Sequence, residues 1–331
     1  MNLTNLLPPQ QYRFYYSRLS RPESHIYDLL LSGMMRGAKE IQCNGCHPDQ
    51  IQLVFRYITL DVPEAFFVKN IQLRYPVSNP LRCTVIPNYR FSLIQTHDTL
   101  IKMSQECSAL LRGVAGRDDF SKERAIHDYL ASSVQYKDVE APYSHEAPGV
   151  LLFHIGVCEG IAKAFKFLAD RLGIPSVVAF GSASSQGHIE NHAWNIVEID
   201  GAFYHIDTTF DTTLSADQIR YDFFNLSDAD IKRTHHWDEE YPSCCKTNGL
   251  YERLGYCFTN GIDLAKYLSN TCATKRVVTF KYPFAGLFSP EKVTSSITGF
   301  IDTILQRTFT DSTSYELSYN LNQMVFQIKL L

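Results

Sequence analysis

Three residues in the middle of the chain have the types needed for thiol-based acyl transfer: Cys158, His192 and Asp207. A thiolate can attack an amide carbonyl, an imidazole can accept and return the proton, and a carboxylate can orient the imidazole. Cys158 has an alternative interpretation as a small buried thiol. His205 competes with His192 for the role of base, although its position in the middle of a strand favours a structural role.

The residues after Cys158 predict a helix that begins at this cysteine. One apolar stripe is formed by Ile161, Ala164, Phe165, Leu168 and Leu172. Gly173 and Pro175 then supply the stop signal. At the helix N-terminus, free backbone N–H groups and the helix dipole stabilise a thiolate. Gly156 and Gly160 on either side suit a position that another molecule approaches closely.

A β-hairpin is predicted to bring the imidazole and the carboxylate together. Its strands are 192–199 and 202–207, joined by Asp200-Gly201, a pair typical of a type I′ turn. A two-residue loop puts Ile199 opposite Ala202. In that register His192 and Asp207 lie on the same face as diagonal neighbours.

Three motifs, GVCEG, HAWNIVEIDGAFYHID and DTTFD, resemble the transglutaminase-like superfamily of papain-type folds, most closely its bacterial transglutaminase-core proteins. The resemblance extends from about residue 119 to residue 211. It implies that Cys158 is the nucleophile, His192 the base and Asp207 the residue that orients the base. It also implies an α+β core in which the helix bearing the cysteine packs on an antiparallel sheet bearing the histidine and the aspartate.

The elements on either side of this core predict a similar order at both ends of the chain. Strand, helix, strand and strand are expected at 41–43, 48–60, 66–75 and 81–86, and again at 277–282, 293–305, 315–319 and 324–330. We therefore predict an N-terminal α+β accessory region (1–115), a catalytic core (116–245) and a C-terminal α+β accessory region (246–331).

The connecting segments carry further expectations. Residues 1–22 are expected to be an irregular lead-in, followed by helices at 22–36, 98–112 and 121–134. A short buried strand at 177–180 precedes a loop at 181–187. A short helix capped by Ser227 is expected to include the structural residues His235 and His236.

Composition excludes several classes of partner. The chain has 331 residues, 45% of them hydrophobic, and a formal net charge of −4. No Lys/Arg-rich run indicates a nucleic-acid or membrane-surface partner, and no apolar run approaches the ~20 residues of a membrane span. The N-terminus lacks the plan of a signal peptide, so the nine cysteines predict reduced thiols in the cytoplasm.

Two motifs that resemble metal or haem sites are set aside. Cys43-x-x-Cys46-His47 matches covalent haem attachment and half of a zinc site, but an Asn-Gly turn with two incidental thiols fits better. His188 and His192 lie four residues apart without the H-E-x-x-H pattern. We therefore expect neither a cofactor nor a metal.

The predicted activity is hydrolysis of a peptide or amide, because no EF-hand-like loop suggests calcium-controlled crosslinking. The alternatives are a transamidating transglutaminase, an arylamine acetyltransferase and a non-catalytic protein-binding module on the same scaffold. The Cys158 backbone N–H is one candidate donor to the oxyanion. The family often takes a second donor from a side chain upstream.

Overall fold

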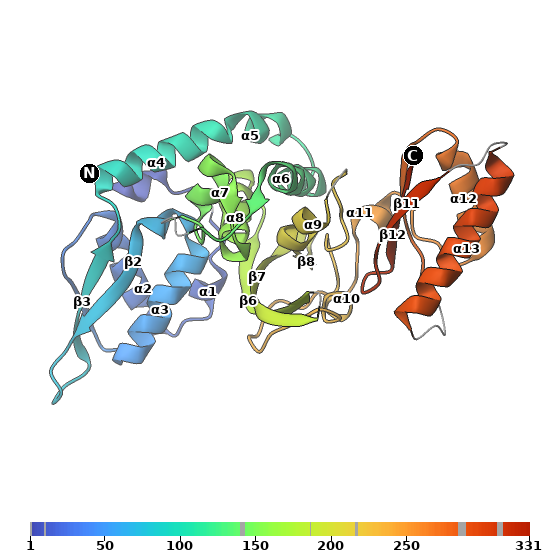
Figure 1. Cartoon of the computed structure of the whole chain (residues 1–331). Helices are drawn as coiled ribbons and strands as arrows, with labels where there is room; N and C mark the ends of the chain where they lie inside the picture. Colours follow the sequence, from blue (N-terminus) through green and yellow to red (C-terminus); the bar gives the residue numbers. More distant parts are fainter. Residues whose placement is uncertain are drawn as a thin grey trace. The chain divides into compact units, whose positions relative to one another are not determined.

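The computed structural model describes residues 2–9, 11–139, 143–185, 187–215, 218–283, 289–309 and 314–331 (Figure 1). The chain divides into two compact units, one made of Met1–Arg220 and His235–Cys244, the other of Tyr221–Thr234 and Cys245–Leu331. The three-part division at residues 115 and 245 stays a prediction. Within the described ranges, no helix combines the length and the apolar character needed to cross a membrane.

The N-terminal part of the first unit has the predicted strand, helix, strand and strand. Its elements are η1 (Leu3–Leu6), α1 (Phe14–Ser17), α2 (Arg21–Met35), β1 (Ile41–Asn44), α3 (Pro48–Asp61), η2 (Pro63–Phe67), β2 (Val68–Arg74) and β3 (Arg82–Tyr89). The strands form an antiparallel sheet in the order β1-β3-β2. The expectation of an irregular lead-in is wrong, because η1 and α1 bury Leu3, Phe14 and Tyr15.

Two helical boundaries also differ from prediction. The helix expected at 98–112 is two helices, α4 (Leu93–Glu106) and α5 (Ser108–Val114), separated at Cys107, where a ψ of −3° leaves the α-helical value. Helix α6 (Asp119–Ser133) begins two residues earlier than predicted. The Asp118 side chain accepts a hydrogen bond from the Ser121 N–H and so caps the first turn.

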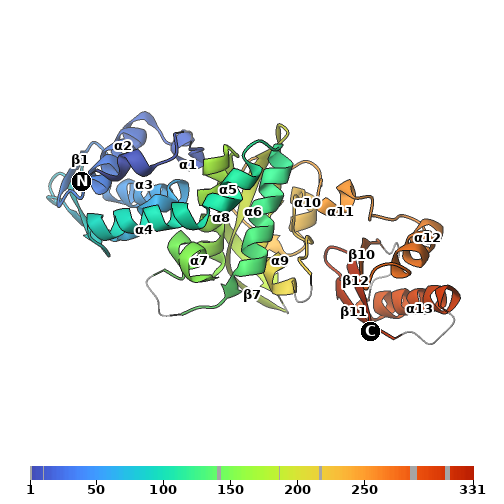
Figure 2. The same cartoon turned by 90° about the horizontal axis from the view of Figure 1, so that it is seen from above.

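The central part of the first unit packs a helix on a four-stranded antiparallel sheet, which confirms the predicted α+β fold class. Its elements after α6 are β4 (Gln135–Tyr136), α7 (Ala147–Phe153), β5 (Ile155–Gly156), α8 (Cys158–Leu172), β6 (Ser176–Ser185), β7 (His188–Ile199), β8 (Ala202–Ile206), α9 (Thr208–Leu214) and β9 (His235–His236). The sheet order is β8-β7-β6-β9, and α8 contacts β6, β7, α6 and α7 (Figures 1 and 2).

The predicted hairpin register is confirmed. Ile199 pairs with Ala202, and Asp200 and Gly201 have φ values of 53° and 75°, as a type I′ turn requires. The loop predicted at 181–187 from its small residues is wrong, because strand β6 continues through it as far as Ser185. Gly181 is needed there, because a side chain would collide with the His236 carbonyl on the adjacent strand β9.

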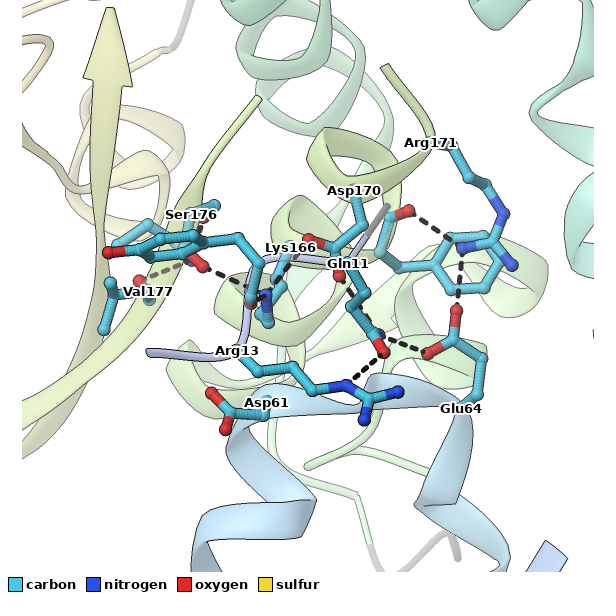
Figure 3. Close-up of polar contacts among 12 residues, drawn as sticks. Gln11, Arg13, Asp61, Glu64, Lys166, Asp170, Arg171, Ser176 and Val177 are labelled. Carbon is cyan, nitrogen blue, oxygen red and sulfur yellow. Dashed lines mark hydrogen bonds and ion pairs between the residues drawn. The ribbon is translucent and has the colours of Figure 1, made fainter. Parts of the chain in front are cut away.

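Helix α8 is buried on all sides, not along one stripe. Its Lys163, Lys166 and Asp170 are at most 3% exposed. Lys166 Nζ donates to Tyr12 O at 2.8 Å, Ser176 O at 3.0 Å and Asp170 Oδ1 at 3.0 Å, which uses all three donors of the ammonium group (Figure 3). The N-terminal segment therefore covers the polar face of the helix.

Three further contacts, made by Gln11 and Arg171, extend this polar cluster to η2. Gln11 Nε2 donates to Asp170 Oδ2 at 3.2 Å and to Glu64 Oε2 at 3.1 Å, and Arg171 Nη1 lies 2.8 Å from Glu64 Oε1 (Figure 3). Every charged group in the cluster has a partner of opposite charge or a hydrogen-bond donor or acceptor. Burial of charge is tolerated only under that condition.

The second unit repeats the strand, helix, strand and strand order. Its elements are α10 (Asp228–Ile231), α11 (Leu250–Arg253), α12 (Gly261–Cys272), β10 (Val277–Lys281), α13 (Pro290–Thr308), β11 (Tyr315–Asn320) and β12 (Val325–Leu330). The antiparallel sheet has the order β10-β12-β11, so its last strand is central, as in the N-terminal sheet. Helices α12 and α13 supply Leu268 and Ile301 to its core.

Replacing Lys166 by Met tests the importance of the buried ammonium group. We expect the first unit to lose about 3–5 kcal/mol of unfolding free energy, because the change leaves two backbone carbonyls and the Asp170 carboxylate without their donor. Urea unfolding followed by circular dichroism measures it. Lys102→Met, at an exposed lysine of α4, is the matched control and should change the unfolding free energy little. Equal stability of the two variants would contradict the prediction.

Candidate active site

Cys158 is the first residue of α8 and is partly exposed. The residue before it, Val157, has extended backbone angles and offers no side-chain cap. The first-turn N–H groups, which have no acceptor within the helix, therefore have no cap from the preceding side chain. The sequence suggested that Gly156 and Gly160 leave space for the approach of another molecule, and this is wrong. Side chains there would collide with Val150 and with the Ser144 backbone, so the glycines let this chain's own loop approach the helix.

His192 lies on β7 opposite Gly181 and is 7% exposed. Its Nε2 is 2.8 Å from Asp207 Oδ2, and its side chain also hydrogen-bonds Cys158. Nδ1 is then the ring nitrogen that remains for the sulfur. Burial lowers the pKa of His192, but Asp207 first and Cys158 second outweigh burial and raise this pKa to about 10. A charged imidazole beside sulfur is the arrangement that favours a thiolate.

Asp207 joins three elements through one carboxylate. It follows β8, and its Oδ1 accepts from the Phe210 N–H at 3.1 Å and so caps α9. Its Oδ2 accepts from His192 Nε2 and from His235 Nε2, the latter at 3.0 Å. Burial raises the pKa of Asp207, but His192 and His235 outweigh burial and hold it well below its usual range. The carboxylate stays ionised and its orientation is determined by its donors.

His235 is the residue that sequence reasoning missed. It was expected in a short helix with a structural role, but that helix ends at Ile231 and His235 lies on β9, opposite Ala183 of β6. The sequence signal was weak, because two adjacent histidines in a two-residue strand show no periodicity. His205 has the predicted structural role, since its Nδ1 accepts from Trp194 Nε1 at 3.0 Å.

His192, Asp207 and His235 each offer one possible metal-ligand atom, and these atoms lie within 4.8 Å of one another. Both imidazole Nε2 atoms, however, are directed at the same carboxylate oxygen at hydrogen-bond distance. A zinc ion would need these atoms to converge on it at ~2.0–2.2 Å. The geometry therefore fits a hydrogen-bonded group better than a coordination site.

A cavity of about 480 Å³ adjoins His192. Its lining includes Tyr136, Glu190, Asn191, Thr209 and Phe210, together with the exposed His188. The other sulfur motif lies elsewhere: Cys43 is buried in β1, and burial raises its pKa to about 12. A thiol that hydrogen-bonds a charged imidazole, which in turn contacts an ionised carboxylate, can carry out attack on an acyl group and proton transfer, and this imidazole borders the cavity.

Part of the chain is similar to a known family. Residues 108–208 match the transglutaminase-like superfamily, which confirms the resemblance found in the sequence. No curated protein matched the sequence.

Three solved structures are similar at low identity. A protein from Cytophaga hutchinsonii proposed to be a cysteine protease is 17% identical, with a TM-score of 0.29, over 42% of this chain and 61% of that one. A TGase is 14% identical, with a TM-score of 0.29, over 50% and 49%. Menin, crystallised to reveal its binding site for the Mixed Lineage Leukemia protein, is 12% identical, with a TM-score of 0.27, over 92% and 64%. In each case this chain spans less than two thirds of the solved chain.

Replacing Asp207 by Asn tests the electrostatics of the pair. Because the pKa of folded His192 is raised from 6.5 to about 10, its stabilising contribution is complete below pH 6.5 and is lost as the pH rises through 10. In Asp207→Asn we expect the His192 NMR titration midpoint to fall toward or below 6.5, and the loss of stability over this pH range to shrink. An unchanged midpoint would show that Asp207 does not hold the proton.

Proposed function

We propose that this chain, whose residues 108–208 are transglutaminase-like, is a cysteine-dependent acyl-transfer enzyme that hydrolyses a peptide or amide substrate. Cys158 is the nucleophile, His192 the base and Asp207 the residue that orients His192. The observation that carries the proposal is His192 between the Cys158 thiol and Asp207 Oδ2, with the imidazole pKa raised to about 10. A cytoplasmic location stays a prediction from the sequence.

The proposed reaction has two steps. The Cys158 thiolate attacks the amide carbon, and the C=O π electrons move to oxygen. Collapse breaks the C–N bond, and His192 gives its proton to the leaving amine, which leaves a thioester. His192 then takes a proton from water, the hydroxide attacks the thioester, and the acid and free Cys158 are released. Asp207 keeps Nδ1 directed at the sulfur by accepting from Nε2.

Water and an amine compete for the same thioester. We propose hydrolysis, and the cavity beside His192 is large enough to admit either acceptor. Adding cadaverine to the acylated protein separates the two activities: hydrolysis gives the free acid, and transamidation gives the acyl-cadaverine. If acyl-cadaverine dominates at low millimolar amine, a transglutaminase activity replaces the hydrolase.

Selective modification of Cys158 tests the nucleophile. At pH 6 we expect iodoacetamide to modify Cys158 first, because His192 hydrogen-bonds its sulfur, with the exposed Cys245 as the internal control for accessibility. His192→Ala should slow the reaction at Cys158 by about 10²-fold, since an unassisted thiol with pKa ~8.5 is roughly 0.3% ionised at pH 6. Peptide mapping by mass spectrometry measures both sites.

Equal rates of iodoacetamide modification at Cys158 and Cys245, with no effect of His192→Ala on the rate at Cys158, would contradict the proposal that the protein is an enzyme. The binding-module alternative would then be favoured. It predicts that Cys158→Ala leaves the biological role of the protein unchanged.

A further inference from the structure

The leaving-group side of the substrate lies beside His192 in the proposed reaction. His192 gives its proton to the departing amine, so that amine must come within hydrogen-bond reach of the imidazole. The cavity of about 480 Å³ that His192 lines is therefore the space next to the substrate residue that contributes the amine. The chemical character of the cavity lining decides which kind of residue fits there.

Glu190 places a carboxylate in this cavity. It lies two positions before His192 on β7, so the two side chains share one face of the sheet with Cα atoms about 6.5 Å apart. Directly opposite Glu190 on β6 is Ala183, whose small side chain leaves the carboxylate exposed. The proton of His192 is already directed at Asp207 Oδ2, at 2.8 Å, so this imidazole has its own counter-charge.

The charge of Glu190 is not neutralised within the cavity. Its carboxylate has no ion pair or hydrogen bond with the residues that the structure describes, and the nearby imidazole of His188 forms no ion pair with it. The described lining of the cavity contains no lysine and no arginine. The second cavity beside α8 differs, because there Glu146 and Glu159 face Lys163 Nζ at 2.9 Å and 2.8 Å. Glu190 is therefore available to a cationic ligand.

The phenol of Tyr136, on another wall of the cavity, reports the sign of the electrostatic potential there. The pKa of this phenol is raised above its ordinary 10.0, first by partial burial and then by the charges of Cys158, Glu190, Asp207 and Asp138. The contribution of these charges means that a further negative charge is disfavoured at this wall. The same potential favours a positive charge.

The remaining lining suits the apolar stem of a long side chain. Phe210 and Leu214 line the cavity, and the ring of Tyr136 is exposed to it. Arginine and lysine combine an alkyl stem with a charged end, so they match an apolar wall and a carboxylate together. An aromatic ring adds a favourable cation–π contact. An acidic side chain would instead meet an unpaired carboxylate of the same charge.

We propose that Glu190 is a specificity-determining residue, which selects substrates that carry arginine or lysine on the leaving-group side of the cleaved amide; this inference rests on the proposed function. The cationic end of the side chain donates to the Glu190 carboxylate, and its stem lies along Phe210 and Leu214. The α-amine of the same residue is then released beside His192.

The test runs the leaving-group step in reverse. p-Nitrophenyl acetate acetylates Cys158, and argininamide and citrullinamide at equal concentration then compete for the thioester with their α-amines. The two amines have nearly the same shape and differ in side-chain charge. We expect N-acetyl-argininamide to exceed N-acetyl-citrullinamide by about tenfold, as a charge-assisted hydrogen bond provides. Mass spectrometry measures both products, after subtraction of those formed with Cys158→Ala.

Three variants show whether Glu190 causes the preference. Glu190→Gln keeps the size of the side chain without its charge, so the product ratio should fall to about one. Glu190→Lys should bring the ratio below one, because it repels the guanidinium. Glu198→Gln, at the other end of β7 and outside the cavity, is the matched control and should keep the tenfold ratio. Melting temperatures confirm that the variants are folded.

Each other outcome overturns the inference. A wild-type ratio of about one, an unchanged ratio in Glu190→Gln, or no acetylation of either amine does so and leaves the proposed function intact, because the acetyl-enzyme is still hydrolysed. A parallel fall of both products in Glu190→Gln also does so, since the carboxylate would then act on the reaction at Cys158 and not on the charge of the amine. If wild-type Cys158 is not acetylated at all, the proposed function fails together with this inference.

Discussion

The buried ammonium group of Lys166 is the constraint on which the first unit depends. A charge with no exposed surface costs several kcal/mol unless every donor finds an acceptor. The acceptors come from the N-terminal segment, from the start of β6 and from α8 itself. Satisfying one side chain therefore attaches two other parts of the chain, the N-terminal segment and the start of β6, to the helix that begins with Cys158. The nucleophile gains a rigid support, although Lys166 lies two turns away from it.

The carboxylate of Asp207 plays a similar role nearer the sulfur. It completes the hairpin, caps α9 and accepts from two imidazoles, so its position is determined from several directions. A carboxylate held in this way can orient His192 without moving during the reaction, which is the condition for electrostatic preorganisation. His235 contributes by occupying the same oxygen. Because β9 pairs with β6, the sheet that carries His192 also carries the residue that holds its partner.

Local rules predicted the parts of the site that depend on neighbours in sequence. Asp200-Gly201 demands positive φ at both positions, so it determined the hairpin and its register. Gly173 ends α8 for the same reason. Local rules failed where long-range packing decided the outcome. The small residues of 181–185 read as a loop, yet they extend strand β6, because they pair with β7 on one side and residues 182 and 183 pair with the distant β9 on the other.

The sequence by itself determined which residues could carry the chemistry. The predicted helix start identified Cys158, the hairpin register placed His192 and Asp207 on one face, and the family resemblance implied a role for each. Only the tertiary structure decided what surrounds them. Burial of the polar face of α8, the contact of His235 with Asp207, and Tyr136 in the cavity beside His192 all join segments separated by many residues. Such contacts leave no periodic signal, since they form only when separate segments must satisfy the same buried charge or fill the same space.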